Sequence, residues 1–288
     1  RTVAEDGSLW MFEFQGNNAG GGMFNVLVPP YDDVRVRRGL IMATRQDAII
    51  AALGGEGISE PATQLYAEDS PWYSEEAAEA YASYDFDGAM ALLEDYINDA
   101  DRSDGKAVGE KLDVVLSCPP DPTLIAAMEV TQQFWNETGL VNTELTAFDQ
   151  ATHINMALGM ANEFRGEHEV HCWRWGSESD PGGENSGSAP WETSPFNFSN
   201  WHDPDHYALL EEARTTDDVA ARAALYGQAS IMVNEHAPIY FSGGTATAIA
   251  TEAGLGGFDS WILPDGEIGI GHPSAEGRWG QAYWTEME

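Results

Sequence analysis

Positive charge is scarce in this chain: of its 288 residues, 13 are Lys or Arg and 48 are Asp or Glu, which gives a formal net charge of -35 at pH 7. Such a surface would repel the phosphates of a nucleic acid, and it disfavours an anionic membrane surface for the same reason. The acids are dispersed along the chain, which is typical of a solubilising surface suited to a salty medium. A cleft that attracts cations is the alternative interpretation.

Cysteines and long apolar runs are also scarce. Cys118 and Cys172 are the only cysteines, and they are either two buried thiols or one disulfide, of which we favour the thiols. A metal site would need more ligands than this pair, and we expect no metal and no cofactor. No stretch reaches the roughly 18 apolar residues of a membrane span. The chain opens at Arg1 without an initiator methionine or a signal sequence, which is typical of a mature or partial product.

Catalytic signatures are missing as well. Neither a G-x-S-x-G nor an H-E-x-x-H pattern occurs, so we expect a protein without enzymatic activity. The glycine-rich run Gly16 to Gly22 has no Walker lysine, and it does not predict a phosphate loop.

What the sequence does contain is a folded chain with 43% hydrophobic and 11% aromatic residues. Strands are predicted over Ser8–Phe14, Lys111–Ser117, Val141–Ala147, Glu169–Trp175 and Pro238–Phe241. Helices are predicted over residues 34–50 after Asp33, 85–98, 122–138 after Asp121, and 149–160, then after Asp203 and from Thr216 to about Glu235. Residues 58–80 and everything beyond Ser242 are predicted to be loops.

The middle of the chain defines the fold class. Strand, helix, strand, helix, strand between Lys111 and Trp175 predicts an α/β layer with at least partly parallel pairing. In such sheets ligands bind beyond the carboxyl ends of the strands. The stretch from Val170 to Pro181, VHCWRWGSESDP, contains most of the last of these strands and the loop that follows its carboxyl end.

This stretch carries the candidate site. Indole rings beside carboxylates can build a pocket in which the acids orient a cationic group. We therefore expect Trp173, Trp175, Glu178 and Asp180 to line a cleft. The alternative is an ordinary core strand followed by a solvated turn.

Several motifs then resemble one family. PPYDDVRVR at Pro29–Arg37 is similar to the "PPFDDVRVRQAL" segment of the family 5 extracellular solute-binding proteins, the dipeptide, oligopeptide and nickel type that feeds ABC importers. YDFD at Tyr84–Asp87 resembles the family's "YDPEKAKALL", and Trp175–Pro181 resembles its tryptophan and Asp-Pro segment. The run from Asn200 to Pro238 is similar to its "LL..AR.T.D...R..LY" stretch.

The resemblance implies a periplasmic-binding-protein-like (type II) lobe with a mixed sheet and flanking helices. Residues 1–237 would form the second lobe, and residues 238–288 would return towards a first lobe that is mostly absent. It further implies a monomer that captures a peptide or similar small solute, partners the permease subunits of an ABC transporter, and is periplasmic or extracellular, with or without a lipid anchor. Binding of a nickel chelate, a sugar or another solute, and a non-transport interaction module, stay open as alternatives.

The resemblance also bears on single residues. Peptide-binding relatives hold the ligand's amino group with an aspartate shortly after the tryptophan, and here Glu178 or Asp180 would be that anchor. Dipeptide binders place an arginine in the loop that here reads Cys118–Asp121 without one, which puts recognition of a free carboxylate there in doubt. Nickel-type relatives use histidine. The residues His168, His171, His202 and His206 show no ligand spacing, and we expect surface histidines.

Overall fold

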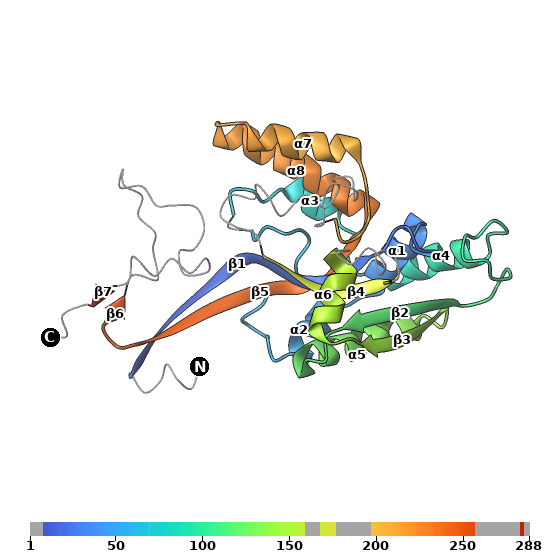
Figure 1. Ribbon diagram of the computed structural model, residues 1–288, viewed down its shortest axis with the longest axis horizontal. Helices are drawn as coiled ribbons and strands as arrows, with labels where there is room; N and C mark the ends of the chain where they lie inside the picture. Colours follow the sequence, from blue (N-terminus) through green and yellow to red (C-terminus); the bar gives the residue numbers. More distant parts are fainter. Residues whose placement is uncertain (1–7, 69, 159–167, 177–196, 257–282, 285–288) are drawn as a thin grey trace.

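The computed structural model describes residues 8–68, 70–158, 168–176, 197–256 and 283–284. Its centre is a five-stranded sheet in the order β3-β2-β4-β1-β5 (Figure 1). The strands are β1 (Leu9–Phe24), β2 (Leu112–Cys118), β3 (Val141–Ala147), β4 (Val170–Gly176) and β5 (Ile239–Glu252). A second pair, β6 (Leu255–Gly256) and β7 (Tyr283–Trp284), lies beyond the far end of β5.

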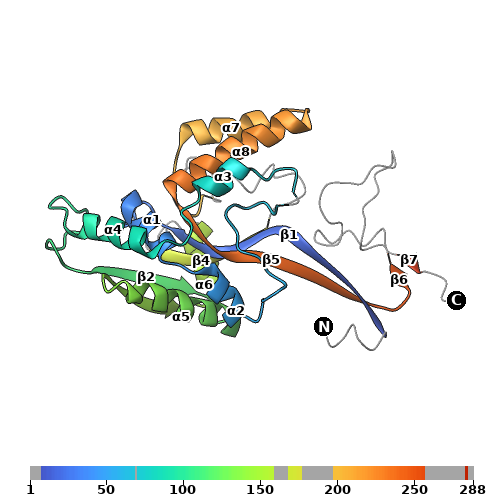
Figure 2. The ribbon, with the colours of Figure 1, turned by 180° about the vertical axis from the view of Figure 1, so that it is seen from behind.

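Helices cover both faces of the sheet. They are α1 (Val34–Met42), α2 (Gln46–Ala52), α3 (Glu75–Ala80), α4 (Phe86–Ile97), α5 (Pro122–Glu137), α6 (Gln150–Leu158), α7 (Pro204–Arg214) and α8 (Val219–His236). In both views α3, α7 and α8 lie on one side of the sheet, and α2 and α5 lie on the other (Figures 1 and 2). Within the described ranges, no helix combines the length and the apolar character needed to cross a bilayer.

The predicted parallel pairing is confirmed. β2 runs parallel to β3 along its whole length, and parallel to β4 through the pairs Leu116↔Val170 and Ser117↔His171. β1 is antiparallel to both β4 and β5, which makes the sheet mixed as expected. The carboxyl ends of the three parallel strands therefore meet at one edge, where the candidate stretch leaves β4.

The aspartate caps read from the sequence predicted most helix starts correctly. The side chains of Asp33, Asp85, Asp121 and Asp203 accept backbone N–H groups at the starts of α1, α4, α5 and α7. Such a cap contributes about 1 kcal/mol by satisfying donors that have no partner within the helix. The helix expected at Thr216 instead starts at Val219 with Asp218 as its cap.

Two other predictions in this part of the chain are wrong. The helix expected over residues 34–50 is two helices, because α1 ends at Met42 and α2 starts at Gln46. Thr44, in the break, donates its hydroxyl to the carbonyl oxygen of Leu40 at 2.8 Å. The segment expected as a loop over residues 58–80 contains α3, which Ser74 caps through the N–H of Ala77.

The strands β1 and β5 are much longer than predicted. They form an antiparallel ribbon that extends away from the body of the molecule (Figure 1). The glycine run belongs to this ribbon, because a Cβ at Gly21 would overlap the carbonyl oxygen of Tyr240 on β5. Beyond Ser242 the run TATAIAT is rich in β-branched residues and continues β5, whereas the prediction had placed a loop there.

The cysteines form a disulfide, so the interpretation as two thiols is wrong. Cys118 at the end of β2 is bonded to Cys172 on β4, with 5.2 Å between their Cα atoms. The bond extends the short β2–β4 ladder by one rung, because Cys118 follows Ser117, the last residue of β2 paired with β4. It ties the carboxyl end of β2 to β4, at the residue before Trp173.

The main core lies between the sheet and helices α1, α2, α4 and α5. Trp135 of α5 is fully buried, and its indole Nε1 donates to the carbonyl oxygen of Leu40 at 3.0 Å and to the hydroxyl of Thr44 at 2.9 Å. Its ring meets the ring of Tyr240 edge-on, with centroids 5.7 Å apart. This indole therefore joins α5, α1 and β5.

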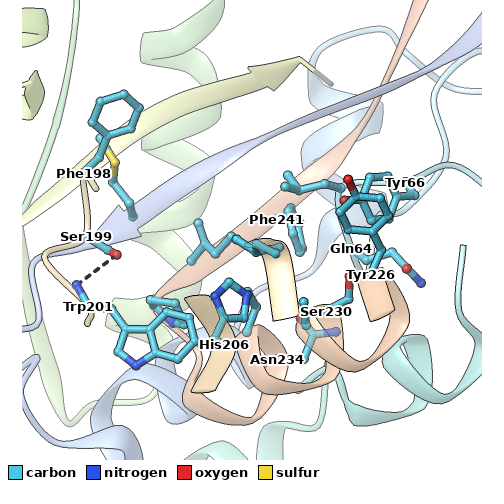
Figure 3. Close-up of a pocket in the computed structure, with 17 residues that line it drawn as sticks. Gln64, Tyr66, Phe198, Ser199, Trp201, His206, Tyr226, Ser230, Asn234 and Phe241 are labelled. Atoms are coloured by element: carbon cyan, nitrogen blue, oxygen red, sulfur yellow. Dashed lines mark hydrogen bonds between the residues drawn. The ribbon is translucent and has the colours of Figure 1, made fainter. Parts of the chain in front are cut away.

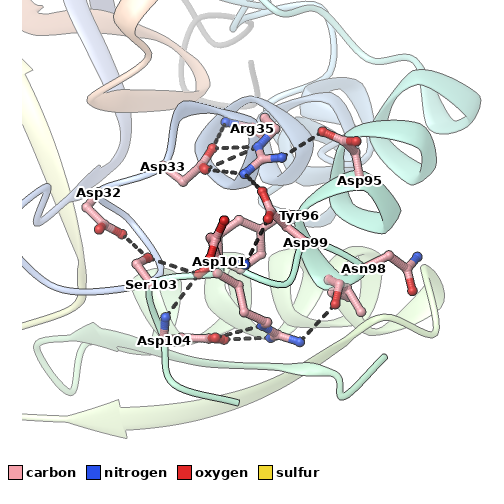
Figure 4. A network of polar contacts seen from close by, with 12 residues as sticks. Asp32, Asp33, Arg35, Asp95, Tyr96, Asn98, Asp99, Asp101, Ser103 and Asp104 are labelled. Atoms are coloured by element: carbon pink, nitrogen blue, oxygen red, sulfur yellow. Dashed lines mark hydrogen bonds and ion pairs between the residues drawn. The ribbon is translucent and has the colours of Figure 1, made fainter. Parts of the chain in front are cut away.

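Arg35 lies at the centre of a cluster of acidic side chains where α1 meets α4 (Figure 4). Its guanidinium pairs with Asp33 at 2.7 Å, Asp95 at 2.8 Å and Asp99 at 2.9 Å. The neighbouring Arg37 and Arg38 donate instead to backbone carbonyl oxygens of α8. These arginines are used within the fold, and the pattern does not indicate an anion site.

Candidate functional site

The predicted site residues start on β4. Trp173 is half-buried in the middle of the strand and pairs with Gly21 of β1. Trp175 lies two residues further on, in register with Ala19. The side chain of Trp175 lies outside the described part of the structure, as do Glu178 and Asp180. Trp173 is therefore the one predicted site residue whose side-chain contacts lie within the described part of the structure.

Trp173 contacts rings from two other segments. The ring of His153, on α6, stacks on it with centroids 6.0 Å apart and 20° between the planes. The ring of Phe198, just before α7, lies 4.8 Å away. Because side chains alternate along a strand, His171 points to the same face as Trp173, while Val170 and Cys172 point into the main core.

A column of histidine rings continues from Trp173. His171 stacks on His153 at 4.1 Å and lies 4.5 Å from His168. His168, His171 and His206 are buried, so the expectation of surface histidines is wrong for these three; His202 is exposed as expected. The strand period places His171 on the face opposite Val170 and Cys172, and the sequence alone does not show that this second face is covered as well.

Two of these rings are neutral at pH 7. Burial, together with the neighbouring rings of His168 and His153, lowers the pKa of His171 to about 2. Burial also lowers the pKa of His153. The Nδ1 of His171 shares a hydrogen bond with the hydroxyl of Ser117. Nε2 of His153 lies 3.0 Å from the carbonyl oxygen of Cys172, so this nitrogen carries the proton.

Stacked rings are a poor arrangement for a metal, because the ring nitrogens do not converge on one point. Among the described residues, no group of three or more His, Cys, Asp or Glu side chains could hold a metal ion. Of these histidines, His153 stacks on Trp173, and His171 in turn stacks on His153.

The loop that follows β2 offers no positive charge to a ligand. It reads Cys118, Pro119, Pro120, Asp121, and its cysteine is tied to β4. The carboxylate of Asp121 accepts the N–H groups of Thr123 at 2.9 Å and Leu124 at 3.2 Å. The start of α5 is therefore already occupied by an internal anion, and a ligand carboxylate would have to displace it.

A cavity that the sequence analysis missed lies next to Phe198 (Figure 3). Its volume is about 90 Å³, and it lies between α7 and α8 on one side and β1 and β5 on the other. Phe198 contacts Trp173 and also lines this cavity. The signal that could have revealed it is the pair of small residues Ala229 and Ser230 on the inner face of α8.

The strand order shows a mixed α/β fold, and comparison with known proteins identifies the family. Residues 1–201 match the model of the bacterial extracellular solute-binding proteins, family 5 (middle), so the chain belongs to this family. It is a family of binding proteins, which confirms the resemblance derived from the motifs.

Relatives and solved structures agree with the assignment. The chain is 28% identical over 243 residues to the dipeptide-binding protein of Escherichia coli, and 28% identical over 251 residues to di/tripeptide-binding protein 1 of Pseudomonas aeruginosa. Each match covers 82% of this chain and 42% of the relative, so the chain spans less than half the length of these proteins. A Pseudoalteromonas dipeptide-binding protein, solved with Met-Leu, superposes with a TM-score of 0.68 at 20% identity over 99% of this chain and 52% of its own. This likeness confirms the type II fold.

Proposed function

We propose that this chain is the second lobe of a substrate-binding component of an ABC importer, which captures a peptide in a cleft between two lobes and delivers it to the membrane permease. The observation that carries the proposal is the family match over residues 1–201, together with two curated relatives that bind di- or tripeptides. We infer a binding role without catalysis, since the family is one of binding proteins.

The ribbon supports the two-lobe organisation. The β1–β5 pairing shifts register between Gln15 and Ala19, and this shift divides the ribbon into an inner part on the sheet and an outer part towards β6. We assign residues 1–237 to the second lobe and residues 238–288 to a return segment. The outer ribbon would then connect the two lobes, with the rest of the relatives' length forming the first lobe.

We propose that Trp173 and Trp175 contact the ligand and that Glu178 or Asp180 holds its amino group. Trp173 supports the proposal because its ring, in the middle of β4, contacts the rings of His153 and Phe198. Because burial lowers the pKa values of His153 and His171, these two rings add no positive charge that would oppose an ammonium group there. An oxidising location outside the cytoplasm fits the Cys118–Cys172 disulfide.

The test uses the full-length protein, purified gently and examined by native mass spectrometry for a bound molecule. A peptide would support the proposal, while a metal chelate or a sugar would keep the importer and remove the acidic anchor. Glu178→Gln and Asp180→Asn are then compared with Asp217→Asn, which changes an exposed acid on the segment before α8. A charge-assisted contact is worth about 1.5–3 kcal/mol, so one of the first two variants should weaken peptide binding roughly ten- to hundredfold. Unchanged affinity in both would refute the anchor.

A further inference from the structure

The cavity beside Trp173 lies between two hydrophobic clusters. The main core contains Phe241, whereas α7 and α8 pack through a separate cluster that contains Leu210, Tyr226 and Ala229. The cavity of about 90 Å³ is lined by residues of both clusters (Figure 3). Protein interiors are usually packed without such a space, so its walls need an explanation.

The inner face of α8 creates the space. The residues of α8 that line the cavity are Tyr226, Ala229, Ser230, Val233 and Asn234. These positions follow the helical spacing of three and four residues, so they form one stripe. The two central members are small, whereas a filled core would place larger side chains there. The cavity is therefore set by the sequence of the helix.

Two polar side chains in the walls, Gln64 and Asn234, hold the backbone of neighbouring segments. Gln64 donates through Nε2 to the carbonyl oxygen of Ser74 at 2.9 Å and accepts the N–H of Ser74 at 3.2 Å. Nδ2 of Asn234 donates to the carbonyl oxygens of Thr63 at 2.9 Å and Ala77 at 2.6 Å. His206, Ser230 and two tyrosines also line the cavity, but most of its surface is apolar, and its apolar members include Met23, Leu65, Leu210 and Ile239. The chemistry that suits such a cavity is a hydrocarbon group.

The cavity adjoins the candidate site. Phe198 lines it and contacts the ring of Trp173 at 4.8 Å. Met23 also lines it, and Met23 pairs with His171, two residues before Trp173 on β4. A ligand lying on Trp173 is thus one ring away from the space.

We propose that this cavity receives an aliphatic side chain of the bound peptide, which enters beside Phe198 and gives the protein a preference for branched aliphatic over small side chains. This inference rests on the proposed peptide-binding function. The size of the cavity determines which side chain fits. A cavity of about 150 Å³ admits benzene, and this one of about 90 Å³ fits a smaller branched group.

The experiment measures the dissociation constants of Leu-Leu and Ala-Ala for the full-length protein by calorimetry. Ala229→Leu fills the cavity, and Ala224→Leu adds the same side chain on the exposed face of the same helix. We expect the unaltered protein and Ala224→Leu to prefer Leu-Leu by about tenfold or more, since pocket methylenes discriminate on this scale. Ala229→Leu should abolish that preference and leave the affinity for Ala-Ala unchanged.

The second variant is Val233→Ala, which enlarges the cavity and keeps the test decisive if Ala229→Leu does not fold. It should shift the preference from Leu-Leu towards Phe-Phe. A retained preference in folded Ala229→Leu, or no shift in Val233→Ala, would overturn the cavity inference while peptide binding stands. If neither Leu-Leu nor Ala-Ala binds the unaltered protein, the proposed function itself fails.

Discussion

The two faces of strand β4 differ in how they are filled. On one face, Val170 and Cys172 are buried in the main core, and Cys172 is covalently tied to β2. On the other face, His171 and Trp173 carry a column of stacked rings beside a cavity. One face therefore holds the strand in the core, while the other carries stacked rings and borders unfilled space, where we propose that a ligand binds.

The same division runs through the neighbouring strands. Phe24 and Tyr240 alternate onto the filled face, where their rings lie 5.8 Å apart. Met23 and Ile239, the residues adjacent to them in sequence, line the cavity. A single residue step along a strand thus separates the part that stabilises the sheet from the part that we assign to recognition.

The sharpest test of this division compares two tryptophans. Trp135→Ala, on the filled face, should lower the free energy of unfolding by about 4 kcal/mol, because it leaves a cavity and removes a buried hydrogen-bonded indole. Trp173→Ala, on the open face, should cost about 1 kcal/mol, since the ring is half-exposed, and should weaken ligand binding instead. Urea unfolding followed by circular dichroism measures both. Equal losses would show that the two faces share one structural role.

The second test removes the bond that fixes the filled face. Replacing both Cys118 and Cys172 by Ala should lower the free energy of unfolding by roughly 2–4 kcal/mol, because the unfolded chain loses a cross-link that spans 54 residues. A reducing agent should destabilise the unaltered protein by a similar amount and leave the double variant unaffected, which urea unfolding would measure. An unchanged midpoint in the reduced unaltered protein would contradict the stabilising role of the bond.

The sequence predicted what local signals determine. The strands β2, β3 and β4 and the Asp caps follow from alternation and capping chemistry within a few residues. The outer ribbon escaped prediction because Gly20–Gly22 resemble a loop until Tyr240 is brought against them. The disulfide escaped for the same reason, since only the parallel pairing of β2 and β4 brings its cysteines together.

The candidate site shows the same limit. Trp173 lies on β4, a strand that the α/β pattern predicted, whereas the binding roles of Trp173, Trp175, Glu178 and Asp180 remain predictions. The support from His153 and Phe198 could not be foreseen, because these residues come from α6 and from the segment before α7. The small residues Ala229 and Ser230 on α8 are a local signal for the cavity, but they leave a space only because α8 lies opposite β1 and β5, which no local pattern specifies.

The last and smallest effect concerns pH and the open face. His171 has a pKa of about 2 in the folded protein, whereas an unfolded histidine has a pKa of about 6.5. The unfolded chain therefore binds a proton that the folded chain excludes, so stability is fully present above pH 6.5 and falls as the pH drops towards 2. Between pH 7 and pH 5 the loss from this residue should be about 2 kcal/mol.

Carboxylates also make the free energy of unfolding depend on pH, so the prediction compares the pH dependence of two variants with that of the unaltered protein. His171→Gln should unfold with a shallower loss of stability between pH 7 and pH 5 than the unaltered protein, and His202→Gln, at an exposed position, should keep the original slope. Urea unfolding at each pH gives the free energies. If His171→Gln keeps the full slope, the histidine column takes up protons in the folded state, and the open face would then carry positive charge beside Trp173, against the proposed binding of an amino group there.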